Sequence, residues 1–401
     1  MRIVLIWCAA AILAVIAGAS AFGAVTKHKR PDLALRAWPP NGFAFAELAD
    51  VALKKEVRAL GGQLPGRLDR KYREWARQAL SAEPTSIVAM RTLGLFGQGE
   101  GRDEQARNLM RLAVRSSRRD TIVNLWLIND YSQAGDIDAT LEVYDQTLRT
   151  LSYERRGFLL TTMARALADP IFVEPYYHLL RRSPPWGEAF WRQAAQTAPA
   201  MENAARLRIR LARGGTGPNA ETDAMLLSGL IGQRKYDAAR TLHAALRTKP
   251  TASSDNILVN GDFSQAADLP PFDWKLNTQG ELGAGINTRS GVLEISAVDG
   301  ARGVVAEQLV HLAPDQYHLQ ARLAGSAQEK DVPAHIEISC ATSPSNAREP
   351  FDIGLSYVEV SRSVDLRQEV CDYYWVRIVV AAEEREGAVE FALDRLLLTR
   401  G

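Results

Sequence analysis

Hydrophobic and polar positions follow two rhythms along this chain, and the rhythm changes near residue 250. From about Phe43 to Thr248, apolar residues recur three and four positions apart, which is typical of amphipathic helices. After Asn256, apolar and polar residues alternate, which is typical of strands with one buried face. The pattern predicts a multidomain chain, with an all-α part over residues 44–250 and an all-β part over residues 253–401.

The helical part repeats itself with a fixed period. The phrase LGLFGQGEGRDEQARNLM begins at Leu93, and LINDYSQAGDIDATLEVY begins at Leu127, 34 positions later. In this alignment Gly101 coincides with Gly135, at the turn between two helices. The phrase QRKYDAARTLHAAL follows the same pattern close to four periods after the first copy. The period predicts stacked helical pairs, because one pair cannot cover its own apolar face.

A period of 34 with a turn between two helices resembles the tetratricopeptide repeat, over roughly residues 70–248. The resemblance implies a curved solenoid whose groove holds a protein partner or a peptide. Between Asp169 and Ala200 several prolines interrupt the helices, so no repeat register is predicted there. Two Arg-rich helix ends, at 111–119 and 206–213, are interpreted as a basic face for an anionic partner or as solvated helix faces.

The all-β part contains several short alternating segments. One of them presents four apolar residues to one face, namely Tyr317, Leu319, Ala321 and Leu323. Its other face carries His318, Gln320 and Arg322. A later segment carries Tyr373, Trp375 and Arg377 in its outward phase. Short strands joined by Gly, Pro and Asn turns predict an antiparallel β-sandwich or jelly roll.

The phrases NILVNGDFSQ (256–265) and AVEFALDRLLLTR (388–400) open and close this part. They resemble the jelly-roll carbohydrate-binding modules of the four/nine and twenty-two type. The resemblance implies sugar binding by aromatic rings and planar polar side chains. If the two strands are neighbours, we predict one glycan platform made of Tyr373, Trp375, Arg377, His318, Gln320 and Arg322. The alternative is that Trp375 packs in the core or against the helical part.

Modules of this type often hold a structural calcium ion near the opening phrase and on the closing strand. Asp394 matches the closing acid, whereas Ser264 stands where an acid often occurs. A calcium site near Asp394 therefore stays an open expectation, and no other cofactor is expected. Six His and three Cys leave little material for zinc or thiol chemistry. Cys340 and Cys371 lie beside strands, and we expect either a disulfide in an oxidising compartment or two separate buried thiols.

Residues 3–25 carry no charge and are long enough to span a bilayer. Residues 1–25 are therefore predicted as a transmembrane anchor or, because 19–21 is a possible cleavage site, as a signal peptide. Residues 26–43 are polar and contain three prolines, which predicts a linker. Lys27, Lys29 and Arg30 favour a cytoplasmic body, whereas the signal-like start and the cysteine pair favour export. We predict a single span in a bacterial inner membrane with the domains in the periplasm, or secretion to the periplasm after cleavage.

Charge divides the chain in the same place as the hydrophobic pattern. Residues 1–250 carry 36 Lys and Arg against 24 Asp and Glu, whereas residues 251–401 carry 12 against 23. Nucleic acid is therefore not an expected partner, because no basic surface extends over the whole chain and no base-stacking motif accompanies the charge. No catalytic constellation is apparent in the sequence.

Together these patterns indicate a bacterial envelope protein that is not an enzyme. Proteins that resemble this pairing occur with polysaccharide synthesis and export machinery, so we expect an adaptor with a solenoid for a protein partner and a jelly roll for a glycan or another subunit. One alternative is a purely structural scaffold whose oppositely charged halves dock and whose jelly roll no longer binds sugar. Another is a glycan-active enzyme, which would need two carboxylates flanking the scissile bond.

Overall fold

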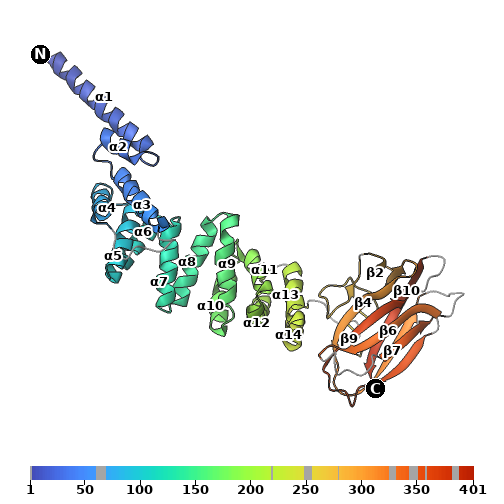
Figure 1. Ribbon diagram of the computed structural model, residues 1–401. Helices are drawn as coiled ribbons and strands as arrows, with labels where there is room; N and C mark the ends of the chain where they lie inside the picture. Colours follow the sequence, from blue (N-terminus) through green and yellow to red (C-terminus); the bar gives the residue numbers. More distant parts are fainter. Residues whose placement is uncertain are drawn as a thin grey trace. The chain divides into compact units, whose positions relative to one another are not determined.

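The computed structural model describes residues 2–59, 69–217, 220–247, 255–278, 280–324, 331–342, 351–356, 359–381 and 388–401. Helices precede strands along the chain (Figure 1), which confirms the predicted fold class. The chain divides into two compact units, Met1–Leu159 and Leu160–Gly401. The second unit holds the last helices together with all the strands, so the change from helices to strands near residue 250 falls inside it.

The first unit contains the helices α1 (Arg2–Thr26), α2 (Pro31–Ala37), α3 (Gly42–Ala59), α4 (Arg70–Ala82), α5 (Ile87–Gly99), α6 (Asp103–Ser116), α7 (Thr121–Gln133), α8 (Ile137–Thr150) and the start of α9 (Tyr153–Ala166). The second unit continues with α10 (Val173–Leu180), α11 (Gly187–Gln196), α12 (Met201–Arg213), α13 (Ala220–Gly232) and α14 (Tyr236–Leu246). Short 3-10 turns at 170–172 and 198–200 precede α10 and α12. Pro184 and Pro185 lie between α10 and α11, which accounts for the short helices in the proline-rich stretch.

The segment predicted as a linker, residues 26–43, contains a helix. Pro31 starts α2, where its fixed φ suits the first helical position and its missing N–H costs no hydrogen bond. Gly23 of α1 is buried, and a Cβ atom there would come within 3.1 Å of Trp38 and Asn41. The prolines at 39 and 40 separate α2 from α3. The segment predicted as a linker thus contains one short helix, Pro31–Ala37, between α1 and α3.

The 34-residue period appears directly in the helix bounds. The starts of α5 and α7 are 34 residues apart, and so are the starts of α6 and α8. Gly101 and Gly135 occupy the same turn with φ of 72° and 73°, in the left-handed region. In each turn the residue after the glycine donates its backbone N–H to a carbonyl five residues earlier, as at Arg102 and Gly97. This bond closes the helix end and leaves the next helix antiparallel to the first.

Buried ion pairs join the helices within each unit. Arg91 of α5 is buried and contacts the carboxylates of both Asp50 on α3 and Asp120 at the start of α7. In the second unit, Arg208 of α12 donates from Nε and Nη2 to the two oxygens of Asp223 at 2.7 and 2.9 Å. Arg208 belongs to one of the Arg-rich helix ends, so at least this arginine is a packing residue rather than part of a basic surface.

Within the described part of the chain, the strands form two antiparallel five-stranded sheets. The first has the order β1-β4-β9-β6-β7, with β1 (Lys275–Leu276), β4 (Arg302–His311), β9 (Tyr373–Ala381), β6 (Asp331–Cys340) and β7 (Phe351–Ser356). The second has the order β2-β3-β10-β5-β8, with β2 (Leu282–Asn287), β3 (Val292–Ala297), β10 (Val389–Arg400), β5 (Gln316–Leu323) and β8 (Val360–Asp365). We refer to them as the β9 sheet and the β10 sheet.

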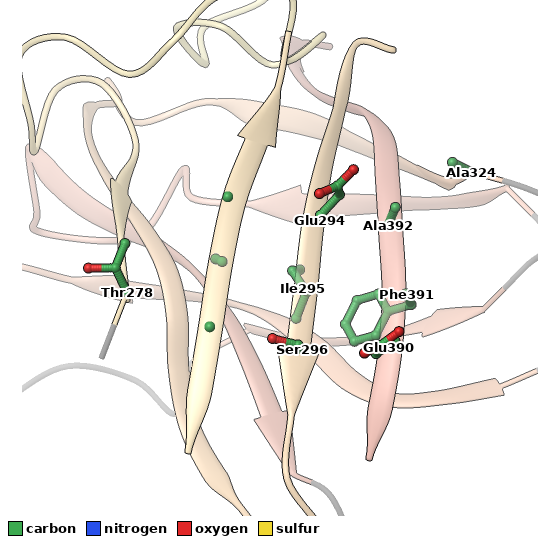
Figure 2. Close-up of a pocket in the computed structure, with 11 residues that line it drawn as sticks. Thr278, Glu294, Ile295, Ser296, Ala324, Glu390, Phe391 and Ala392 are labelled. Atoms are coloured by element: carbon green, nitrogen blue, oxygen red, sulfur yellow. The ribbon is translucent and has the colours of Figure 1, made fainter. Parts of the chain in front are cut away.

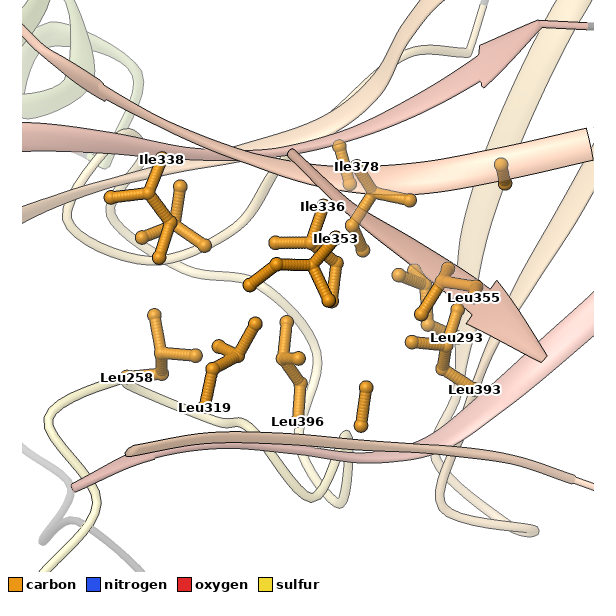
Figure 3. Close-up of a cluster of buried hydrophobic side chains, with 14 of the residues drawn as sticks. Leu258, Leu293, Leu319, Ile336, Ile338, Ile353, Leu355, Ile378, Leu393 and Leu396 are labelled. Atoms are coloured by element: carbon orange, nitrogen blue, oxygen red, sulfur yellow. The ribbon is translucent and has the colours of Figure 1, made fainter. Parts of the chain in front are cut away.

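Branched apolar side chains from the two sheets fill the space between them (Figure 3). Ile336 and Ile378 come from the β9 sheet, and Leu319 and Leu396 come from the β10 sheet. These positions are the apolar phase of the alternation, and all four side chains are almost completely buried. The burial of this phase leaves the alternate positions of the strands, such as Arg322 on β5 and Arg377 on β9, on the outer faces of the sandwich.

The left-handed turn between α13 and α14 generates a stability prediction. Arg234 occupies the position of Gly101 and Gly135, with φ of 59°, and its side chain is exposed. A left-handed conformation costs a non-glycine residue about 1 kcal/mol. Arg234→Gly should therefore raise the free energy of unfolding by about 1 kcal/mol, and Gly135→Ala should lower it by a similar amount, as measured by urea unfolding. A destabilised Arg234→Gly protein would contradict the left-handed turn.

Candidate functional site

The six residues predicted to form one glycan platform lie on two different sheets. Tyr373, Trp375 and Arg377 belong to β9, at the centre of one sheet. His318, Gln320 and Arg322 belong to β5, between β10 and β8 in the other sheet. The outer faces of the two sheets of a sandwich point in opposite directions. The six residues therefore do not form a single platform, because their strands are not neighbours.

The β5 residues face other strands of the β10 sheet. His318 pairs across strands with Ser363, and Gln320 with Ser361. Arg322 donates from Nε to both carboxylate oxygens of Asp394, at 2.8 and 3.0 Å. The register of β10 against β5 shifts between Leu393 and Arg395, so Asp394 lies at an irregularity in the strand.

The surroundings of Asp394 do not fit a calcium ion. Both oxygens of this carboxylate already accept from a guanidinium, and a second cation beside Arg322 would be repelled. Calcium requires six to eight oxygen ligands. Among the residues that the structure describes, no three His, Cys, Asp or Glu side chains gather as metal ligands.

Trp375 and Arg377 form a preorganised polar and aromatic surface on the outer face of the β9 sheet. Both side chains are half-buried, and the guanidinium carbon of Arg377 lies 5.3 Å from the ring centre of Trp375. Arg377 donates to Glu307 at 3.2 Å, to Glu337 at 3.1 Å and to Ser339 at 3.3 Å. The arrangement holds an aromatic ring, a cation, two carboxylates and a hydroxyl in fixed positions. Such groups can stack on a sugar ring and bond to its hydroxyls.

Tyr373 is buried and contacts a helix instead of solvent. Its ring stacks on Tyr236 of α14 with ring centres 5.1 Å apart. Its hydroxyl donates to Asp237 at 2.7 Å and accepts from Nε of Arg240 at 3.1 Å. Burial raises the pKa of Tyr373 to about 12, so the hydroxyl keeps its proton at any physiological pH. The alternative prediction is that Trp375 packs in the core or against the helical part. It is Tyr373, two residues earlier on β9, that contacts the helix.

A disulfide supports the strand ends that receive α14. Cys340 and Cys371 are bonded, with Cα atoms 6.0 Å apart, which confirms the predicted pair. Next to the bridge, Ala341 donates its N–H to the carbonyl of Tyr373 at 2.8 Å. The carbonyl of Ala341 in turn accepts from the hydroxyl of Tyr236 at 2.8 Å. The bridge therefore ties together the two segments that contact Tyr236. We call this set of contacts between α14 and the jelly roll the α14 joint.

A second aromatic contact completes the α14 joint. The ring of His243 stacks on Phe272, with ring centres 5.1 Å apart, and both side chains are buried. The Phe272 segment is held on the sheet because Leu309 of β4 donates to the carbonyl of Pro271 at 2.7 Å. Burial, followed by the charge of Arg247, lowers the pKa of His243 to about 4. His243 is therefore neutral at pH 7. The α14 joint was not predicted from the sequence. Tyr236 and His243 lie seven positions apart on α14, which is about two helical turns, so both aromatic rings lie on the same face of the helix.

An open groove lies on the outer face of the β10 sheet and has a volume of about 740 Å³. Figure 2 shows Glu294 and Ser296 on one strand and Glu390 on its neighbour, beside the groove. Glycines at 283 and 285 on β2 line it as well. Asn287 donates to Glu294 at 2.8 Å. A smaller hollow of about 470 Å³, lined by Lys275 and Glu307 among others, lies at the β1 edge of the β9 sheet.

Comparisons with known proteins identify similar folds. No protein-family model matches the sequence, and a search of curated proteins finds no match. Among solved structures, the chain is similar to TmCBM61 in complex with β-1,4-galactotriose, at 14% identity over 37% of this chain and 100% of that one, with a TM-score of 0.25. A CBM4 structure gives 14% identity over 36% and 99%, with a TM-score of 0.26. Pseudomonas aeruginosa PilF gives 16% identity over 51% and 90%, with a TM-score of 0.27. At these values the likeness is one of fold and carries no assignment of function.

The neutral, buried His243 generates a pH prediction. Its pKa is about 4 in the folded chain and about 6.5 in an unfolded one. Near pH 4 to 6.5 the folded state therefore binds fewer protons at this residue than the unfolded state does. The contribution of His243 to the free energy of unfolding is fully present above pH 6.5 and is lost as the pH falls through 4. The loss should be on the order of 3 kcal/mol.

Buried Asp273 titrates with the opposite sign, because burial raises its pKa. The variant His243→Phe keeps a ring against Phe272 and retains Asp273. The difference between wild type and this variant therefore gives the contribution of His243 alone to the pH dependence of stability. Urea unfolding at pH 7, 5.5 and 4.5 should show a smaller loss of stability in the variant. Equal losses in both proteins would contradict the buried, neutral state of His243.

Proposed function

We propose that this protein is a non-enzymatic adaptor of the bacterial cell envelope, linked to polysaccharide synthesis or export. In this proposal α1 anchors the chain in the inner membrane, the helical repeats hold a protein partner, and the jelly roll contacts a glycan. The glycan contact is the outer face of the β9 sheet around Trp375 and Arg377.

The geometry around Trp375 carries the proposal for glycan binding. The C–H groups on one side of a pyranose ring can stack on the indole, and its hydroxyls can bond to the groups around Arg377. Glu307 and Glu337 hold the guanidinium from two neighbouring strands. A rigid set of side chains loses little conformational entropy when a ligand binds, and this preorganisation favours affinity.

The N-terminal helix and the disulfide support the localisation in the envelope. The part of α1 from Ile6 to Thr26 has 21 residues and contains an 18-residue stretch with a mean hydropathy of 2.2, so it is long and apolar enough to cross a membrane. A disulfide such as Cys340–Cys371 persists in oxidising compartments such as the periplasm. We therefore place the jelly roll in the periplasm, with α1 retained as an anchor. Secretion to the periplasm after cleavage is the alternative.

The helical repeat supports a role in holding a partner protein. Stacked helical pairs with a regular 34-residue period form extended surfaces, and such surfaces suit peptides and other proteins. On α7 the apolar side chains of Ile122 and Leu125 are exposed to solvent. Exposed apolar groups on a repeat helix are suited to a contact with another chain.

One observation favours the structural scaffold as the second candidate. The charges around Arg377 already satisfy one another, so this face is complete without a ligand. A jelly roll that no longer binds sugar would keep the same ion pairs. The two candidates differ in whether the face around Trp375 binds an oligosaccharide.

The test is binding of oligosaccharides by the full chain in detergent. The probes are β-1,4-galactotriose, cellotriose, xylotriose and an array of bacterial envelope polysaccharides. Wild type should bind at least one probe, and Trp375→Ala should weaken that binding about tenfold, since a lost stacking contact is worth ~1.4 kcal/mol. Tyr153→Ala removes an exposed aromatic ring from α9 in the other unit and should leave binding unchanged. Absence of binding by wild type, or unchanged binding by Trp375→Ala, would favour the scaffold.

A further inference from the structure

The glycan face proposed above ends at the α14 joint. Trp375 and Tyr373 lie two residues apart on β9, so they point to the same side of the sheet and are separated by about 7 Å. At Tyr373 this side of the sheet is covered by α14, whereas at Trp375 it is half-open. A ligand that stacks on Trp375 and extends along β9 toward Tyr373 therefore reaches side chains of the helix.

Two side chains of α14 stand at this border. Asp237 and Arg240 are both exposed, and both bond to the hydroxyl of Tyr373. The bond to Tyr373 uses only Nε of Arg240 and only Oδ1 of Asp237. A guanidinium has four further N–H donors on its two terminal nitrogens, and a carboxylate has a second oxygen. Both residues can therefore bond to a ligand while they keep their contact with Tyr373.

The α14 joint fixes the position of these two groups. Tyr236, next to Asp237 on the helix, is held by its stack on Tyr373 and its bond to Ala341. The disulfide beside Ala341 holds the strand ends on which the helix rests. Polar groups that are already held in place can discriminate between sugar hydroxyl patterns, because a mismatched hydroxyl leaves a bond unmade.

We propose that the glycan-binding face is composite and that α14 of the helical repeat supplies part of it. Arg240 is a donor and Asp237 an acceptor for hydroxyls of the sugar unit next to the one on Trp375. The ligand class is a neutral, hydroxyl-rich oligosaccharide of at least two units. This inference rests on the proposed glycan binding around Trp375. Its consequence is that the helical repeat takes part in glycan recognition itself.

The test measures binding of β-1,4-galactotriose, cellotriose and xylotriose to the full chain in detergent. Arg240→Ala should weaken the best-bound trisaccharide five- to tenfold, and Arg240→Lys should recover part of the loss because it keeps the charge and a donor. Arg395→Ala is the matched control, because Arg395 is exposed on β10 in the other sheet. It should bind like wild type.

A second variant separates a binding role from a structural one. Tyr236→Phe removes the hydrogen bond to Ala341 but keeps the ring that stacks on Tyr373, so the helix stays on the sheet and Arg240 and Asp237 keep their positions. It should lower the midpoint of thermal unfolding more than Arg240→Ala does and should weaken binding less. If Tyr236→Phe weakens binding as much as Arg240→Ala, Arg240 acts through the α14 joint and the composite face is wrong.

The outcomes distinguish this inference from the proposal on which it rests. If wild type binds none of the probes, or if Trp375→Ala binds like wild type, the proposed glycan function fails and the composite face fails with it. If Trp375→Ala weakens binding and Arg240→Ala does not, the sheet binds glycan alone and only the composite face is overturned.

Discussion

The stacking of Tyr236 on Tyr373 is the contact that fixes α14 on the jelly roll within the second unit. It buries two aromatic rings between a helix and a sheet, and each hydroxyl finds a partner, Ala341 for Tyr236 and Asp237 for Tyr373. A buried hydroxyl without a partner costs about 1–3 kcal/mol, so these bonds select one position for the helix. The Cys340–Cys371 bridge holds the strand ends that carry Tyr373 and Ala341, the acceptor for Tyr236. The helix, the disulfide and the sheet face around Trp375 are thus parts of one arrangement.

The sequence predicts the local features of this arrangement well. The period of 34 gives the helix starts, and Gly101 and Gly135 mark left-handed turns because only glycine adopts that conformation without cost. Alternation gives the faces of the strands, since the period of a strand is two residues. The short helix α2 was missed, because three prolines in a polar stretch indicate a linker as readily as they indicate the start of a helix.

The candidate site was harder to predict because it depends on which strands are neighbours. Alternation places His318 and Tyr373 on outer faces but does not say to which sheet each strand belongs. The strand order is set by pairing between distant segments, and it puts β5 and β9 in different sheets. Tyr373 has the phase of an exposed residue, yet a helix more than a hundred residues earlier covers it. Aromatic residues on an amphipathic helix, such as Tyr236, are the signal that could have suggested such a cover.

The α14 joint includes the Cys340–Cys371 disulfide, so this bond must exist in the cell. The oxidation state of the three cysteines in the cell tests this most directly. Cells that express the full chain are quenched with acid, and the denatured protein is treated with a maleimide that adds a fixed mass to each free thiol. Among the three cysteines only Cys8 is free in the structure. The account predicts one added mass without reductant and three after reduction. Three added masses without reductant would show that Cys340 and Cys371 are thiols in the cell, and would contradict both the bridged joint and the periplasmic location.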